Sequence, residues 1–165
     1  MLGDKGAAAG LMSRFHARLR AMGGPWHVWA VGGISFLWNC IGALDYTLSQ
    51  ARNRDYLGVA AKQVGVATAE MIAFIDSFPA WVHAFWALGV WGALAGSILL
   101  LMRSRYAVLA FAASLLGLGV TQLHQALMPK PEWVQTAVPT TLAIAAIAII
   151  LLAYAVLMKR RGVLT

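Results

Sequence analysis

The sequence predicts an all-α membrane protein: a four-transmembrane-helix bundle with an external amphipathic helical segment between spans one and two. Three observations predict this class. Apolar residues make up 61% of the 165-residue chain and the mean hydropathy is +0.72, whereas a soluble domain is closer to half apolar. An uncharged run extends from Pro79 to Met102, and about 20 apolar residues cross a bilayer as a helix. Lysine and arginine are also distributed unevenly along the chain.

Four apolar stretches have the length of a spanning helix, and we expect these spans at about 26–48, 79–102, 106–128 and 136–158. No stretch is long enough for a separate soluble core, so a single membrane domain is expected over 26–158. A basic tail at 1–25 precedes this domain, and a basic end at 159–165 follows it.

The segment at 49–78 is mixed in character and predicts amphipathic helix rather than a fifth span. Its apolar side chains recur at steps of four and three residues: Leu57, Ala61, Val64, Thr68, Met71, Ile75 and Phe78. We expect one or two helices that lie on the membrane or cap the bundle, with a break near Thr68. Pro79 then suits the first turn of the second span, with Ser77 or Phe78 as its cap.

The positive residues predict the orientation of the spans. Nine of the 13 lysines and arginines fall in the N-terminal tail, the loop at 103–105 and the C-terminal end, and four fall on the other side. The acidic residues show the opposite bias, with only one of six on the first side. Cytoplasmic segments of membrane proteins are enriched in lysine and arginine, so both termini are expected in the cytoplasm and 49–78 outside.

Several classes of function are disfavoured by composition. The single cysteine, Cys40, lies in an apolar span, which excludes an intrachain disulfide, a CxxC redox pair and a multi-cysteine zinc site. The net charge of +7 comes without a basic stripe interleaved with aromatic residues, so nucleic acid is not an expected partner. The spans contain no nucleophile–base constellation and no phosphate loop. We therefore expect no enzyme activity, no cofactor and no bound metal.

Polar residues on the first span form a candidate substrate-binding site. They share one helical face or the stripe beside it: Asn39, Asp45, Tyr46 and Gln50. A polar stripe on a spanning helix must face protein or water rather than lipid. Two interpretations fit this stripe. In the first it is a solute or proton site that opens outward, and in the second Asn39 bonds across helices while Asp45 pairs with Arg52 at the membrane surface.

His83, His124 and Gln125 complete the candidate substrate-binding set, near the outer ends of the second and third spans. Asp45 lies at a similar depth, and an aspartate with two histidines would bind a metal or relay a proton. The sequence has no HxxxH or ExxH spacing to support such a site. Interfacial histidines that only form hydrogen bonds are the competing interpretation.

Small residues line the second span and predict close helix packing. Gly92 and Gly96 form a small-xxx-small motif, and Gly89 lies on the same side of the helix. The motif is equally consistent with packing inside one chain and with packing across a homodimer.

The stretches LWNCIGALDYTLSQARNRDYL (37–57) and DSFPAWVHAFWALGVWGALAGSILLLMRSRYAV (76–108) resemble a family of small four-span bacterial inner-membrane proteins. Its members are usually labelled hypothetical or sugar transporters, and the function of the family is unsettled. The resemblance implies the fold and a bacterial inner-membrane location. It covers roughly residues 30–120, and its motif positions include Asn39, Asp45, Tyr46, Arg52 and Pro79. Where similar members often have Thr-Pro-Glu-Gln, this chain has Thr-Ala-Glu-Met at 68–71, which weakens a capping box.

Three functions remain open on these observations. The first is a small-solute, sugar-like transporter that acts as a homo-oligomer, because four spans alone rarely enclose a path across the membrane. The second is an accessory or structural protein that binds a partner membrane protein through the glycine face or the external segment. The third is a membrane enzyme or metal protein that uses Asp45, His83 and His124 at the outer mouth.

Overall fold

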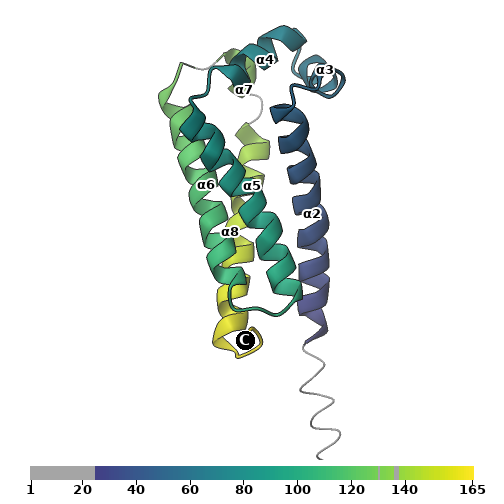
Figure 1. Cartoon of the computed structure of the whole chain (residues 1–165), viewed down its shortest axis with the longest axis vertical. Helices are drawn as coiled ribbons and strands as arrows, with labels where there is room; N and C mark the ends of the chain where they lie inside the picture. Colours follow the sequence, from purple (N-terminus) through teal and green to yellow (C-terminus); the bar gives the residue numbers. More distant parts are fainter. Residues whose placement is uncertain (1–24, 130, 136–137) are drawn as a thin grey trace, which may run out of the picture.

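The computed structural model describes residues 25–129, 131–135 and 138–165, and regular structure in this part of the chain is α-helical throughout (Figure 1). Its helices are α2 (Trp26–Gln50), α3 (Arg54–Gln63), α4 (Thr68–Asp76), α5 (Ala80–Leu101), α6 (Ala107–Leu127), α7 (Glu132–Gln135) and α8 (Val138–Arg160). The expected all-α bundle of four spans is confirmed. The basic tail expected at 1–25 lies, except for Pro25, outside the described residues.

The helices α2, α5, α6 and α8 are each long and apolar enough to cross a bilayer, so the chain is an integral membrane protein. One detail at the start of α5 corrects the sequence analysis. Pro79, with φ −65° and ψ 154°, is itself the N-cap rather than a first-turn residue. Its carbonyl accepts the backbone N–H groups of Val82 and His83. The expected caps Ser77 and Phe78 are therefore wrong.

The most extensive contact in the bundle is between the consecutive helices α5 and α6. Gly89, Gly92 and Gly96 face α6 at distances that leave no room for side chains. A Cβ atom on Gly92 would lie 3.1 Å from the backbone nitrogen of Ser114, and one on Gly96 would lie 2.7 Å from the ring of Phe111. The Ser114 hydroxyl also donates to the carbonyl of Gly89 at 2.6 Å. The glycine face of α5 is thus used for packing within the chain.

The outer two helices add to this central pair, α2 on α5 and α8 on α6. The main cluster of buried apolar residues lies at the end that holds the C-terminus: Val28, Leu100, Ala107, Phe111, Leu151, Ala155, Met158 and Leu164. At the same end, His27 on α2 hydrogen-bonds to the Tyr154 hydroxyl on α8 over 2.5 Å. The C-terminal residues fold back on the α5–α6 turn, where the Thr165 N–H donates to the Arg103 carbonyl at 2.9 Å.

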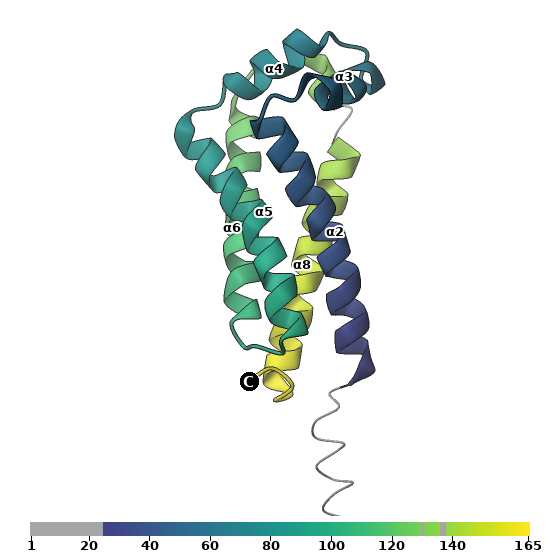
Figure 2. The same cartoon turned by 45° about the vertical axis from the view of Figure 1, so that its right-hand side comes forward.

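The short helices α3, α4 and α7, which we call the cap, lie across the opposite end of the bundle (Figures 1 and 2). The side chain of Asn53 caps α3 by accepting the N–H of Tyr56 at 2.9 Å. A turn with Gly65 at φ 75° ends α3, and α4 begins at Thr68, where the break was expected. The pair bends by 105°, so the segment between the first two spans is two helices at an angle.

The α5–α6 contact predicts opposite outcomes for two alanine substitutions on the same helix. A Cβ atom at Gly117 would lie 2.5 Å from the carbonyl oxygen of Phe85 and 2.9 Å from Cα of Gly89, all backbone atoms. Gly117→Ala should therefore lower the free energy of unfolding by about 1–3 kcal/mol. At Gly119, no atom lies within 4 Å of the position that an added Cβ would take, so Gly119→Ala should leave stability unchanged or raise it, because alanine favours helix. Thermal unfolding in detergent compares the two, and equal Tm values would contradict this packing.

Candidate functional site

The polar face of α2 is used inside the bundle. The Asn39 amide donates to the Ser97 hydroxyl at 2.8 Å and to the Ala93 carbonyl at 3.3 Å, both on α5. The Tyr46 ring stands edge-on to Trp86 at 5.2 Å between centroids and to Trp91 at 6.5 Å. Asn39 thus bonds across helices, as the structural interpretation of the stripe expects.

Asp45 and Arg52 do not pair with each other, which corrects the second half of that interpretation. The Tyr56 hydroxyl donates to the Asp45 carboxylate at 2.5 Å, and Arg52 forms an ion pair with Asp76 at 2.6 Å. The cause lies in the backbone of Arg52, which has φ 52° and turns the chain out of α2. Its guanidinium then donates back to the carbonyls of Ser49 and Gln50 and reaches the end of α4. Tyr56 thus links α3 to α2, and Arg52 links the turn after α2 to the end of α4.

The two histidines both contact the ring of Phe78. Phe78 is 6.0 Å from His83 and 6.0 Å from His124, measured between ring centroids. On α5, His83 bonds to the Gln50 amide at 3.0 Å. On α6, the His124 ring stands edge-on to Trp81 at 5.0 Å, and its buried Nε2 has no hydrogen-bond partner among the described residues.

This arrangement corrects the third hypothesis from the sequence. In the described residues, no three His, Cys, Asp or Glu side chains come together in a group that could hold a metal ion. Asp45 is bonded to Tyr56 on α3, while His83 and His124 each pack on Phe78. The metal site proposed from Asp45, His83 and His124 is therefore wrong, while a proton relay or an enzyme role for these residues stays a prediction.

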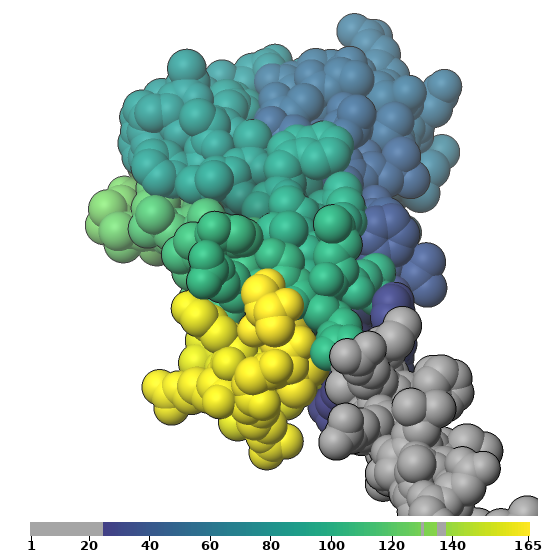
Figure 3. All heavy atoms as spheres, turned by 60° about the horizontal axis from the view of Figure 1, so that its bottom comes forward, coloured from purple at the N-terminus to yellow at the C-terminus, as the bar shows by residue number. Residues whose placement is uncertain are grey.

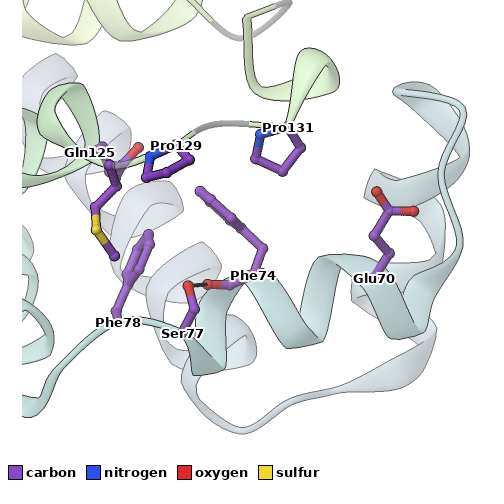
Figure 4. Close-up of a pocket in the computed structure, with 8 residues that line it drawn as sticks. Glu70, Phe74, Ser77, Phe78, Gln125, Pro129 and Pro131 are labelled. Atoms are coloured by element: carbon purple, nitrogen blue, oxygen red, sulfur yellow. Dashed lines mark hydrogen bonds between the residues drawn. The ribbon is translucent and has the colours of Figure 1, made fainter.

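A pocket of about 290 Å³ opens between α4 and the loop that follows α6 (Figure 4). Its apolar walls are formed by Phe74, Phe78, Met128, Pro129 and Pro131. Three polar side chains line it as well: Glu70, Ser77 and Gln125. We call this the cap pocket. A mainly apolar concavity with a few polar groups is typical of small-molecule sites.

Contacts between the cap helices give the pocket its shape. Phe74 packs edge-on against Phe78 at 5.1 Å and against Trp133 of α7 at 5.2 Å. The Trp133 indole N–H donates to the Glu70 carboxylate at 3.1 Å, which links α7 to the start of α4. The Ser77 hydroxyl donates to the Phe74 carbonyl at 2.6 Å. The Gln125 amide forms no hydrogen bond to another described residue. It is therefore available to bind a polar group of a ligand.

Of the candidate residues from the sequence, only Gln125 lines the cap pocket. Asn39, Tyr46 and Gln50 form contacts with α5 instead. Sequence reasoning missed the remaining lining residues because they come from two segments far apart in the chain. Two signals were present in the sequence, namely the i, i+4 pair Phe74 and Phe78 and the two prolines at 129 and 131.

Comparisons with known proteins return no matching family model, no matching curated protein and no matching solved structure. The structure shows that this chain is an integral membrane protein with a four-helix bundle and a helical cap that bears a pocket.

The bond from Tyr56 to Asp45 predicts an unusual alkaline titration. Partial burial, the hydrogen bond to Asp45 and the charge of Asp45 raise the pKa of Tyr56 from 10.0 to about 12. The folded protein thus keeps a proton that the unfolded chain loses. The stabilising contribution of this group is complete below pH 10 and is lost as the pH rises towards about 12.

Tyrosinate absorbance measured during a pH titration tests this prediction. The difference between the wild-type protein and Tyr56→Phe should show one phenol with a midpoint near pH 12. In Asp45→Asn the midpoint should fall towards 10 without reaching it, since burial is the largest cause of the shift. A Tyr56 midpoint near pH 10 in the wild-type protein would contradict the observed bond.

Proposed function

We propose that this protein binds a small hydroxylated, sugar-like solute in the cap pocket and takes part in its transport across the membrane as a homo-oligomer. The observation that carries the proposal is the cap pocket itself, with a volume of about 290 Å³ at one end of the spans. This volume is at the lower end of the range for small-molecule sites. It suits a solute the size of a monosaccharide better than a lipid or a peptide.

The chemistry of the lining suits a solute with one apolar and one polar side. A sugar ring has an apolar face of C–H bonds, which would lie on Phe74 or Phe78, and hydroxyl groups along its edge. The Gln125 amide would donate and accept hydrogen bonds along that edge, and the Glu70 carboxylate would accept them. A hydroxyl that entered beside Phe78 would also give a partner to the buried Nε2 of His124, whose ring packs on Phe78.

The transport step is assigned to an assembly of copies rather than to one chain. The α5–α6 pair is closed by backbone contact at Gly92, and Val82 and Leu100 of α5 are fully buried. A path between copies of the chain would avoid this packed centre. An orientation with both termini in a bacterial cytoplasm would place the cap outside, where it would meet an incoming solute; the excess of basic residues at the other end supports this orientation.

The resemblance to four-span proteins labelled as sugar transporters agrees with this proposal. The accessory-protein alternative loses one of its two surfaces, because α6 covers the glycine face of α5. We accordingly expect Gly92→Leu and Gly96→Leu to disturb folding rather than to remove a partner protein selectively.

Binding of labelled hexoses to the purified protein tests the proposal, with equilibrium dialysis in detergent against glucose, galactose and mannose. Gln125→Ala should weaken binding about tenfold, because it removes a hydrogen bond worth roughly 1.5 kcal/mol. Gln122→Ala is the matched control, since this residue lies one turn earlier on α6 and outside the pocket lining. It should leave binding unchanged.

Uptake into proteoliposomes then separates binding from transport. The proposal expects saturable entry of the hexose that binds best, and a loss of entry in Phe74→Ala. Equal effects of the Gln125 and Gln122 variants would contradict the cap pocket as the site. Binding without any uptake would contradict the transport step alone.

A further inference from the structure

The end of the molecule opposite the cap gathers positive charge from two segments that are far apart in the sequence. Exposed cations there come from the α5–α6 turn and from the end of α8: Arg105, Lys159, Arg160 and Arg161. Two backbone bonds hold these segments together, from Thr165 to the Arg103 carbonyl at 2.9 Å and from Arg105 to the Thr165 carbonyl at 3.1 Å. Figure 3 shows this end, with the last residues of α8 beside the α5–α6 turn.

These four cations have no carboxylate partner within the described part of the chain, where the ion pair is that of Arg52 with Asp76 at the other end. The guanidinium of Arg105 lies 5.3 Å from the centre of the Tyr106 ring, a cation–π contact that leaves its N–H groups able to bind an anion. This end of the protein is therefore a concentrated positive surface at the level where lipid headgroups lie.

An open, shallow apolar groove with a volume of about 400 Å³ lies along α6. Leu152 is its lining residue from α8, and the others come from α6: Ala112, Leu115, Leu116, Gly119, Val120 and Leu123. At Gly119, no atom lies within 4 Å of the position that a Cβ atom would take, so a side chain added there would fill open space on this surface. From Ala112 to Leu123 the helix rises about 16 Å, which is close to the length of a lipid acyl chain.

Helical spacing relates Lys159 at the positive end to the groove residue Leu152. Lys159 follows Leu152 by seven residues and therefore lies on the same face of α8. Arg105 lies in the α5–α6 turn, two residues before α6 begins at Ala107 and seven residues before Ala112. At 1.5 Å per residue, Lys159 lies about 10 Å along the axis of α8 from Leu152. A negative headgroup at the cations would thus continue into an acyl chain in the groove.

We propose that this groove and these cations form a binding site for an anionic phospholipid. Its phosphate would lie between Arg105 and Lys159, with Arg160 and Arg161 adding to the positive field, and one acyl chain would occupy the groove. Basic sites between spanning helices bind anionic lipid headgroups in this manner. The site is at the opposite end from the cap pocket, so it does not depend on the proposed solute. A second copy of the chain could also pack in the groove, but its binding there would not involve the cations. The cations therefore favour an anionic lipid as the occupant.

Lipid titration of the delipidated full-length protein, followed by native mass spectrometry in an uncharged detergent, tests the proposal. Phosphatidylglycerol should bind more tightly than phosphatidylcholine with the same acyl chains. The double variant Arg105→Gln/Lys159→Gln should bind phosphatidylglycerol about 30-fold more weakly, since each cation near the headgroup contributes roughly a fivefold effect. The matched control is Arg54→Gln/Lys62→Gln, which removes two exposed cations from the cap and should leave the affinity unchanged.

A second pair of variants tests the groove without changing any charge. Gly119→Leu places a side chain in the groove and should weaken binding about tenfold, by displacing about two methylene groups of the acyl chain. Gly33→Leu on α2 is its control, because that glycine also has open space around its Cβ position but lies outside the groove. Tm values for both variants show that each remains folded.

Several outcomes would overturn the proposal. Equal affinity for the two lipids would remove the role of the cations, and equal effects of Gly119→Leu and Gly33→Leu would remove the role of the groove. Competition by inorganic phosphate at the lipid concentration would indicate a simple anion site. If native mass spectrometry shows a dimer for the wild-type protein and only a monomer for Gly119→Leu, the groove binds a second copy of this chain instead of a lipid.

Discussion

The structure depends on the close approach of the α5 and α6 backbones. Gly89 of α5 and Gly117 of α6 lie opposite each other, and a methyl group on Gly117 would meet main-chain atoms of α5. Lipid offers no hydrophobic force that would drive two apolar helices together, so contact between small residues and a bond such as Ser114 to Gly89 must supply the attraction. The helices α2 and α8 pack less extensively, α2 against α5 and α8 against α6.

The same helix pair also determines where the cap pocket and the basic end can form. Because α5 and α6 are consecutive and antiparallel, the start of α5 and the end of α6 lie at one end of the bundle (Figure 1). Phe78, just before α5, and Gln125, in the last turn of α6, can therefore both line the pocket. The turn between the two helices forms the other end, where it meets the C-terminal residues and brings Arg105 near the end of α8.

How much the sequence could predict differs between the fold and the site. Uncharged apolar length determines the spans almost alone, so their positions follow from the chain, and the spacing of Gly92 and Gly96 indicates a close helix contact. The ion-pair partner of Arg52 could not be predicted from the sequence. The left-handed backbone of Arg52 turns its side chain away from Asp45 and towards Asp76. The cap pocket did not follow either. Its walls meet only through tertiary packing of Phe74 and Phe78 against a loop about 50 residues away, a distance that helical spacing does not describe.

The central claim is that ligand binding takes place in the cap and not along the polar face of α2. Hydrogen–deuterium exchange on the full chain in detergent, with and without a saturating hexose, tests this most directly. The account predicts slower exchange at 70–78 and 125–131 when the hexose is present, with no change along 39–50. Protection of 39–50 with an unchanged cap would contradict it and would return the site to the Asn39–Gln50 face.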